Sequence, residues 1–209
     1  MGSEILQQNI LNNRVSLNNC LFKAIDDGNI NEVLRIIDQG ADINARNNNG
    51  STPLHVATMD NETNIVSILI QNEADINAKD TNDCTALGFA VLDGNFNMVK
   101  LLVSKGAHVN IQNGDGSTAL SLAVLDSNKE LVEFLLEKKS DVNIKEKFLN
   151  SSTLHLAAKN GDIEIVNILI QYGADINTKD TNGKTALDYA ISCKYREVIE
   201  LLKSKLSLK

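Results

Sequence analysis

Short apolar segments alternate with polar turns along the chain, and residues 52–83 show one complete cycle of this pattern. Apolar side chains at positions 54, 56 and 57 predict a helix of about two turns that ends before the polar residues 60 and 61. A longer apolar stripe predicts a second helix: Ile65, Val66, Ile68, Leu69 and Ile70. The turn-rich residues 79–83 then predict a projecting arm that resembles a β-hairpin. Because helices this short are unstable alone, each one must bury its stripe against a neighbour.

The beginning of the cycle recurs at a nearly constant spacing. Its first leucine returns after 33, 33, 34 and 33 residues: Leu54, Leu87, Leu120, Leu154 and Leu187. Thr52 precedes the helix and can cap it through its hydroxyl, and Pro53 suits the first helical turn, where a missing N–H costs nothing. A fixed period of this length indicates a stack of small units that bury their apolar stripes against one another.

The repeated motif resembles the ankyrin repeat. Residues 52–57 read Thr-Pro-Leu-His-Val-Ala, and a second motif of the form Gly-Ala-Asp-x-Asn accompanies each cycle, most fully at residues 40–44 and 173–177. The resemblance covers residues 17–206, and it implies an all-α solenoid of about six helix-turn-helix units with short β-hairpin arms. The expected units are residues 17–46, 47–79, 80–112, 113–146, 147–179 and 180–206.

The two ends of the chain depart from the motif. Residues 1–16 are polar apart from five positions that permit a weak amphipathic helix, with a frayed tail as the alternative: Ile5, Leu6, Ile10, Leu11 and Val15. The first unit lacks the Thr-x-Leu start, and the last unit is rich in charge between residues 194 and 205. We expect both to be end units with a solvated outer face, followed by a short tail at residues 207–209.

Composition narrows the classes of partner and the compartment. The net charge of −7 opposes a nonspecific grip on nucleic acid or on an anionic membrane. No apolar run approaches the ~20 residues of a membrane span, and no secretory signal is evident. Cys20, Cys84 and Cys193 lack the spacing of a zinc site or a disulfide framework, which favours free thiols in a reducing, cytoplasmic setting. The abundance of Asn, Ile and Lys also resembles ankyrin proteins of intracellular bacteria or protozoa, for which delivery into a host cell is the alternative.

No catalytic, metal or cofactor site is predicted. His55 and His155 occupy one repeat position three units apart, and the resemblance implies that they hydrogen-bond neighbouring units. Five asparagines recur near the arms and are expected to bond the backbone of the turn: Asn44, Asn77, Asn110, Asn143 and Asn177. The sequence carries no phosphate-binding glycine loop, metal-ligand cluster or nucleophile–base pair, so we do not expect an enzyme.

The candidate binding site comes from repeat positions that vary between the copies. Two residues after the alanine that closes the motif, three consecutive units carry large apolar residues and the next two carry polar ones: Met59, Leu92, Leu125, Lys159 and Ser192. This position ends the first helix of each unit and, by the resemblance, borders the concave groove of the array. We predict partner contact at the three apolar residues, with packing between neighbouring helices as the alternative.

Two further groups of residues accompany this row. An acidic row follows it at Asp60, Asp93 and Asp126, of which Asp93 and Asp126 are expected to select a basic partner, with solvation of the turn as the alternative. Phe148 and Leu149 lie in an arm lengthened by one residue and are expected to extend the contact. A basic row on the arms is weakly specific: Arg46, Lys79, Lys145 and Lys179.

The resemblance implies a monomeric protein-protein interaction module that binds another protein through its groove and arms. Neither nucleic acid nor a membrane is an expected partner. The alternatives are a structural spacer or scaffold with no groove ligand, and a host-directed effector that acts by the same binding mechanism.

Overall fold

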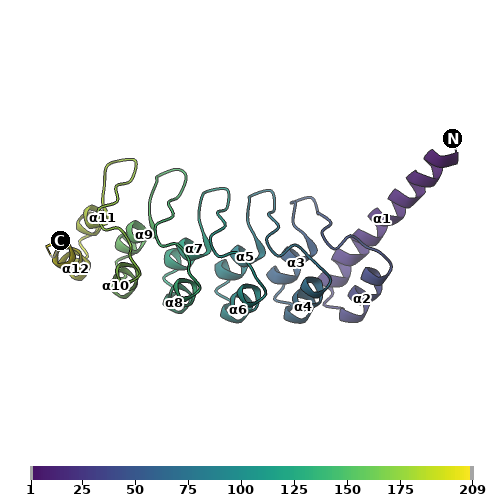
Figure 1. Ribbon diagram of the computed structural model, residues 1–209, viewed down its shortest axis with the longest axis horizontal. Coiled ribbons are helices and arrows are strands. Elements are labelled where there is room, and N and C mark those ends of the chain that lie inside the picture. The colour runs from purple at the N-terminus through teal and green to yellow at the C-terminus, as the bar shows by residue number, and fades with distance from the viewer. Residues whose placement is uncertain (1, 208–209) are drawn as a thin grey trace.

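Twelve α-helices make up most of the structure, a computed structural model that describes residues 2–207, with side chains from Arg14 onward. The helices are α1 (Gly2–Asp26), α2 (Ile30–Asp38), α3 (Pro53–Met59), α4 (Thr63–Gln71), α5 (Ala86–Leu92), α6 (Phe96–Ser104), α7 (Ala119–Leu125), α8 (Lys129–Glu137), α9 (Thr153–Asn160), α10 (Ile163–Gln171), α11 (Ala186–Cys193) and α12 (Arg196–Leu206). They pair into helix-turn-helix units that stack in one row (Figure 1). Residues 2–207 contain no strand, only an isolated antiparallel bridge between Lys145 and Ser152. The all-α solenoid predicted from the sequence is confirmed.

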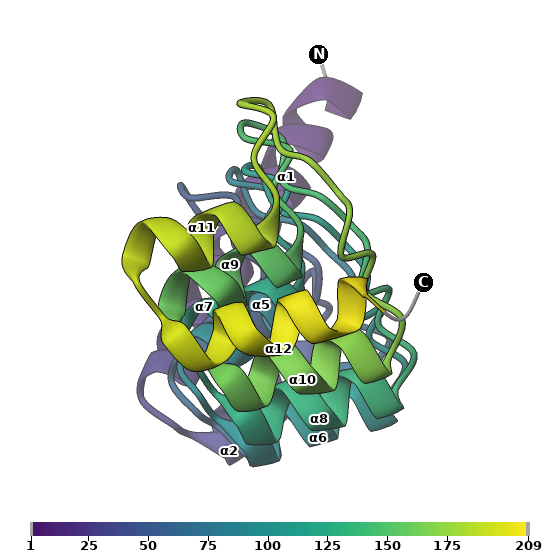
Figure 2. The same cartoon turned by 90° about the vertical axis from the view of Figure 1, so that its left-hand side faces the viewer.

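The helices form two layers, and the loops between units project as arms beyond one of them. Figure 2 looks along the row and shows the odd-numbered helices lying between the arms and the even-numbered helices. Each odd-numbered helix packs on the next one, from α1 against α3 to α9 against α11. We call α3, α5, α7, α9 and α11 the inner helices and the even-numbered helices the outer helices. Every inner helix begins where an arm ends and runs away from that arm.

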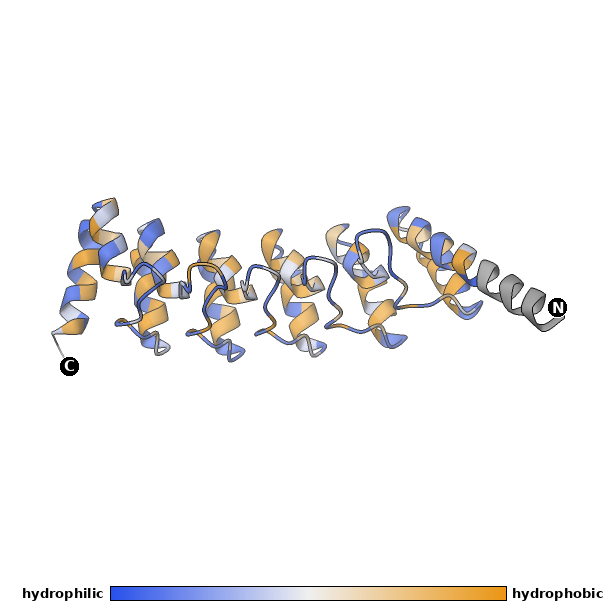
Figure 3. Cartoon of the chain, turned by 90° about the horizontal axis from the view of Figure 1, so that it is seen from above, coloured by the Kyte–Doolittle hydropathy of each residue, from blue (hydrophilic) through white to orange (hydrophobic). Residues whose placement is uncertain are grey.

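Aliphatic residues of repeated size form the core. The alanine that closes the motif is 0–2% exposed in every copy, which lets the inner helices approach one another: Ala57, Ala90, Ala123, Ala157 and Ala190. The motif leucine is buried to the same extent in the first four copies: Leu54, Leu87, Leu120 and Leu154. Apolar residues concentrate on the helices, while the arms and turns are hydrophilic (Figure 3). None of the helices within residues 2–207 is both long and apolar enough to cross a membrane.

The N-terminal helix is longer than the sequence analysis expected. The boundary expected after residue 16 lies inside α1, which runs without interruption to Asp26 and projects beyond the row of units (Figure 1). The next unit meets its C-terminal half, where Leu21 and Ile25 are fully buried. Ile5, Leu6, Ile10 and Leu11, on which the prediction of an amphipathic helix rested, lie outside the residues whose side chains are described. Val15 is 52% exposed.

Two histidines tie neighbouring units, as predicted. The backbone N–H of Thr52 donates to Nδ1 of His55 at 3.1 Å, so the ring proton lies on Nε2, which donates to the carbonyl of Cys84 at 3.1 Å. His155 bonds the carbonyl of Lys184 in the same way at 3.0 Å. Burial is the largest of the influences on both rings and lowers the pKa of each, which keeps them neutral at pH 7.

Asparagine side chains make a second set of ties at the base of the arms. The Oδ1 atom of each accepts from a backbone N–H that lies 31 or 32 residues later, at 2.8–3.0 Å: Asn44 from Asp75, Asn77 from His108, Asn110 from Asp141, and Asn143 from Asp175. The prediction that these side chains bond the backbone of their own turn is wrong for these four asparagines, which bond the next unit instead. Within the turn, Asp42 accepts from the N–H of Asn44 at 3.0 Å.

Backbone hydrogen bonds also join each arm to the next. They run from the N–H of one tip to the carbonyl of the preceding tip, at 2.8–3.2 Å: Thr81 to Asn49, Gly114 to Asn82, Lys147 to Asp115, and Thr181 to Leu149. Gly116 makes one of these approaches possible, because it has a φ of +85° and a Cβ there would lie 2.5 Å from the N atom of Lys147. Each of these arms is therefore tied to the next one near its tip.

The outer face of the last unit is charged, but the unit leaves one large apolar side chain exposed. Arg196, Glu197 and Glu200 are exposed, as expected for a solvated outer face. Ile191, however, is 48% exposed, although its equivalents are 0–4% exposed: Thr58, Val91, Val124 and Ala158. Each of those residues is covered by a following unit, and within the described residues no unit follows Ile191.

Candidate protein-binding site

The three apolar residues that the sequence analysis singled out lie at the surface. Met59, Leu92 and Leu125 are the last residues of α3, α5 and α7 and are 46%, 55% and 58% exposed. They occupy the same place on three consecutive inner helices that pack side by side. We call them the apolar stripe. Since about half of each side chain is exposed, none of the three belongs to the core.

A second apolar row lies one helical turn before the stripe, and the sequence analysis did not identify it. Its members follow the His position of the motif, and all but the first are half-buried: Val56, Phe89, Leu122, Leu156 and Tyr189. Residues three apart share one face of a helix, so Phe89 and Leu122 lie beside Leu92 and Leu125 on the same face as the stripe. We call these five residues the floor row. All five residues directly follow the His position of the motif, and this shared position in every copy could have identified the row from the sequence.

The floor row rests on the frame of the array. The ring of Phe89 packs edge-on against His55 with 5.9 Å between centroids, and Tyr189 packs against His155 at 5.8 Å in the same geometry. The hydroxyl of Tyr189 donates to Asp180 at 2.6 Å. Beside the stripe, the packing against His55 therefore holds the ring of Phe89 in place.

A small cavity lies between α5 and α7, where the array lacks a side chain. Gly88 takes the position that other units fill with a histidine, serine or aspartate. The cavity measures about 10 Å³, which is the space of one water molecule, and its lining includes Gly88, Leu92 and Leu122. It is too small to hold a ligand.

Three aspartates form an acidic row beside the stripe. Asp60, Asp93 and Asp126 are the C-cap residues of α3, α5 and α7, and all are exposed. Partial burial raises the pKa of Asp60, and the negative charges of Asp26 and Glu62 raise it further. No ion pair among the side chains that the structure describes includes any of the three aspartates. The three carboxylates thus form a negatively charged row that makes no ion pair with a described side chain.

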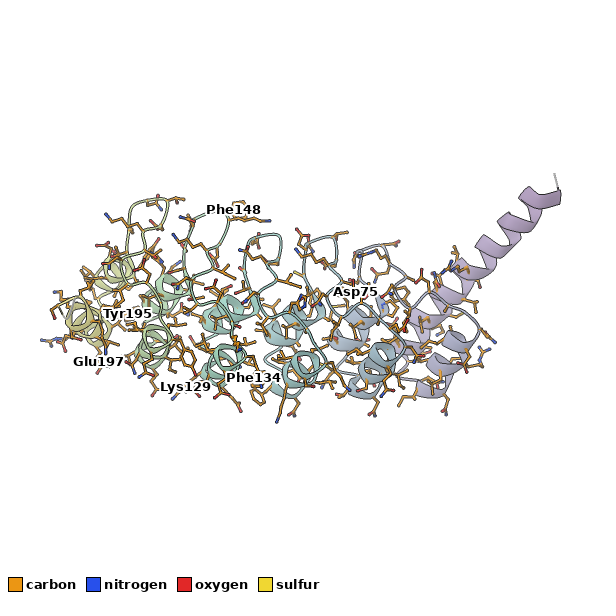
Figure 4. The ribbon with its side chains drawn as sticks, in the orientation of Figure 1. Asp75, Lys129, Phe134, Phe148, Tyr195 and Glu197 are labelled. Atoms are coloured by element: carbon orange, nitrogen blue, oxygen red, sulfur yellow. The ribbon has the colours of Figure 1, made fainter. Side chains whose placement is uncertain are left out.

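Phe148 and Leu149 are exposed but lie apart from the stripe. They are 74% and 47% exposed, and Phe148 lies at the tip of its arm (Figure 4). Arms precede the inner helices, whereas the stripe lies where those helices end. The structure therefore brings together the stripe, the floor row and the acidic row, and places Phe148 and Leu149 on the opposite rim of the inner helices.

The first two cations of the basic row on the arms, Arg46 and Lys79, hydrogen-bond backbone carbonyls of the repeat array. The guanidinium of Arg46 donates to the carbonyls of Gly50 and Lys79, at 2.7 and 2.5 Å. The ammonium of Lys79 donates in turn to the carbonyl of Gln112 at 2.9 Å. These two cations satisfy backbone acceptors, one on the arm of Arg46 itself and the others on the arm that follows each cation.

Metal chemistry has no support among these residues. Within the part of the chain that the structure describes, no group of three or more His, Cys, Asp or Glu side chains is placed to hold a metal ion. The perturbed histidines are the two structural ones, and each ring uses both nitrogens in hydrogen bonds.

Comparisons with known proteins agree with the fold. A family model described as "Ankyrin repeats (3 copies)" matches residues 2–80, 77–146 and 120–208. An ankyrin repeat domain from Acinetobacter baumannii AYE is 32% identical, with a TM-score of 0.81 over 88% of this chain and 96% of that domain. The ankyrin repeat domain of Bcl-3, a member of the IkappaB protein family, is 27% identical, with a TM-score of 0.81 over 88% of this chain and 85% of that one. The ankyrin repeat protein EF0377 is 27% identical, with a TM-score of 0.80 over 89% and 97% of the two chains. A search of curated proteins gives no significant match.

The matched family carries a general function. Ankyrin repeat domains are generally protein-protein interaction modules, and the family is typically non-catalytic. The three matches together cover nearly the whole chain, from residue 2 to residue 208. The stacked helix pairs and the projecting arms recur every 33 or 34 residues, and the two inter-unit histidines occupy one position of that repeat. The chain belongs to the ankyrin repeat family.

Proposed function

We propose that the protein binds a partner protein through the side of the array that carries the apolar stripe. Met59, Leu92 and Leu125 are the apolar anchors, and Asp93 and Asp126 select for positive charge. Phe148 and Leu149 make peripheral contacts on the opposite rim. The observation that supports this best is the half-exposure of three large apolar side chains at one repeat position in consecutive units.

The energetics of such a site favour a few central contacts. Burying a Leu or Met side chain completely contributes about 1.5–3 kcal/mol, so covering the exposed half of each anchor contributes about 1 kcal/mol. Binding affinity in protein interfaces commonly comes from a small number of such central groups. Because the helices and arms are already tied together, the site loses little conformational entropy on binding.

A double substitution of Leu92→Ser with Leu125→Ser tests the proposal. Both side chains are more than half exposed, so the change should remove partner contact without opening the core. We expect far-UV circular dichroism and the melting temperature to stay near wild type. Affinity capture from a relevant lysate, read by mass spectrometry, should lose the partner that the wild-type chain retains.

The control removes apolar surface elsewhere. Leu34 and Tyr172 are 40% and 46% exposed and lie in or directly after the outer helices α2 and α10, so Leu34→Ser with Tyr172→Ser should keep the partner. A large drop in melting temperature of the stripe variant would show that the stripe supports the core. Equal capture by the stripe variant and the wild type would favour a spacer that has no ligand on this surface.

A further inference from the structure

We infer that the segment bound along the apolar stripe is a basic amphipathic α-helix of the partner, with apolar residues recurring every seven positions. The inference rests on the proposed function, because it names the occupant of the same surface. It follows from the spacing of the anchors, from their aliphatic character and from the charge beside them.

Spacing selects the conformation of the bound segment. Packed helices lie about 8–10 Å apart, and each inner helix contributes one anchor, so Met59, Leu92 and Leu125 recur at about that distance. Residues seven apart on an α-helix share a face and lie about 10.5 Å apart. On one face of a β-strand, side chains lie about 6.6 Å or about 13 Å apart, so an extended strand does not match the anchors.

The chemistry of the anchors separates a helix from the remaining candidate. A polyproline II segment advances about 9.3 Å per turn and also matches the spacing. Proline-rich segments, however, dock in grooves lined by aromatic side chains. The stripe consists of one methionine and two leucines, and the aromatic rings of the floor row are half-buried. Aliphatic anchors with methionine are typical of surfaces that receive the apolar face of a helix.

Charge selects the polar flank of that helix. A negative side chain at the C-terminal end of a helix opposes the helix dipole, so Asp60, Asp93 and Asp126 do not stabilise α3, α5 and α7. They repeat beside the anchors and have no cationic partner among the described side chains. Lys or Arg residues next to the apolar positions of the bound helix would supply that partner.

The stripe also sets the length of the bound helix. The fifth unit, residues 147–179, carries Lys159 at the anchor position, so the apolar stripe ends after Leu125. Three anchors span two intervals, which correspond to about 15 residues of helix with apolar positions i, i+7 and i+14. A helix of that length is marginal alone in water and gains its order on the surface that binds it.

Selection from random peptides tests the inference even while the partner is unidentified. A display library of segments about 20 residues long is selected on the full chain and counter-selected on the Leu92→Ser/Leu125→Ser variant. We expect the enriched peptides to be net positive, with apolar residues at i, i+7 and i+14. The leading synthetic peptide should gain helical circular dichroism when it binds the wild-type chain, and it should bind the Leu34→Ser/Tyr172→Ser control equally well.

An isosteric change tests the charge separately. Asp93→Asn with Asp126→Asn keeps the shape of the acidic row and removes two charges. The leading peptide should bind this variant about fivefold more weakly at low salt, and the difference should shrink at high salt because exposed charges are screened.

The outcomes distinguish the two proposals. Enrichment of acidic, proline-rich or alternating strand-like peptides that still depend on Leu92 and Leu125 would overturn the helix and leave the binding stripe intact. Peptides that bind the stripe variant as well as the wild type would overturn both, as would a library that yields no stripe-dependent peptide. Equal binding to the Asp93→Asn/Asp126→Asn variant at low salt would overturn the basic character of the partner.

Discussion

A comparison of residues at equivalent repeat positions shows which side chains join neighbouring units. His55 and His155 use both ring nitrogens for a cap and a carbonyl of the next unit, whereas Gly88 at the same position can do neither. The same contrast holds among the charged residues, since Arg46 and Lys79 bond the next arm while the aspartates beside the stripe bond no described cation. A residue that recurs can thus be recognised as structural by the partner it meets in the following unit.

The two histidines make stability depend on pH. Their pKa is lowered in the folded chain, while in the unfolded chain they titrate near the ordinary value of 6.5. Below about pH 6.5 the unfolded state binds more protons than the folded state does. The free energy of unfolding should therefore decrease as the pH is lowered below about 6.5, and the contribution of the two histidines should be fully present above that pH. Urea denaturation at a series of pH values measures this. A His55→Gln/His155→Gln variant keeps a side chain able to cap but cannot titrate, so its profile should be flatter. A variant profile parallel to that of the wild type would contradict the assignment.

Gly88 is a site where the frame can be improved. It lies inside α5, where glycine costs about 1 kcal/mol relative to alanine, and a Cβ there would meet only the hydroxyl of Thr85 at 3.8 Å. Gly88→Ala should therefore raise the free energy of unfolding by about 1 kcal/mol in chemical denaturation. The matched change Gly116→Ala should lower it, because that Cβ would collide with the backbone of Lys147. Stabilisation by both changes would contradict this account.

At the scale of elements, the sequence predicted the helix pairs and arms because each copy repeats the same apolar spacing, cap and turn. It did not predict that α1 would be one helix, because residues 1–16 lack an apolar stripe strong enough to decide between helix and tail. The sequence feature that favours one continuous helix is the absence of any glycine or proline between Ser3 and Asp27 that would interrupt it. The sequence also could not predict that the Asn side chains bond the next unit and not their own turn, because this depends on which backbone the stacking brings near.

The end unit provides a comparison of one position in two settings. Val124 in α7 is fully buried under the next unit, whereas its equivalent Ile191 in α11 is 48% exposed. Val124→Ala should cost about 2 kcal/mol in the free energy of unfolding, from lost burial and the cavity left behind. Ile191→Ala should cost much less, although it removes more atoms. Chemical denaturation of the two variants measures the difference, and similar losses would show that α11 is covered after all.

For the whole molecule, the sequence predicted where along the repeats the residues of the candidate site occur, but not whether their side chains are exposed. An apolar residue at the end of an inner helix fits both a core and a surface, and only the stacking geometry leaves Met59, Leu92 and Leu125 uncovered. Phe148 was predictable as exposed, because it lies in a lengthened arm. Its separation from the stripe was not, since that depends on the direction in which the inner helices leave the arms.

Stability should be uneven along the row. Central units bury two faces, whereas the unit formed by α11 and α12 contacts neighbours on one side only among the described residues. Amide hydrogen exchange, read by mass spectrometry, should therefore be slowest in α5–α8 and faster in α11 and α12. Protection of α12 equal to that of α7 would mean that the array opens only as a single cooperative block.

The ties between units have a consequence for the gene. The side-chain bond from Arg46 reaches residue 79, that of Lys79 reaches residue 112, and that of Gln112 reaches residue 145, always 33 positions on. Because each tie joins equivalent places, unequal recombination that removes or duplicates one whole copy leaves every remaining unit with a partner. When that copy carries Met59, Leu92 or Leu125, the event also removes or adds one residue of the apolar stripe. Under the binding mode that we propose, the length of the bound segment would then change in single inherited steps, without any new contact having to arise at the same time.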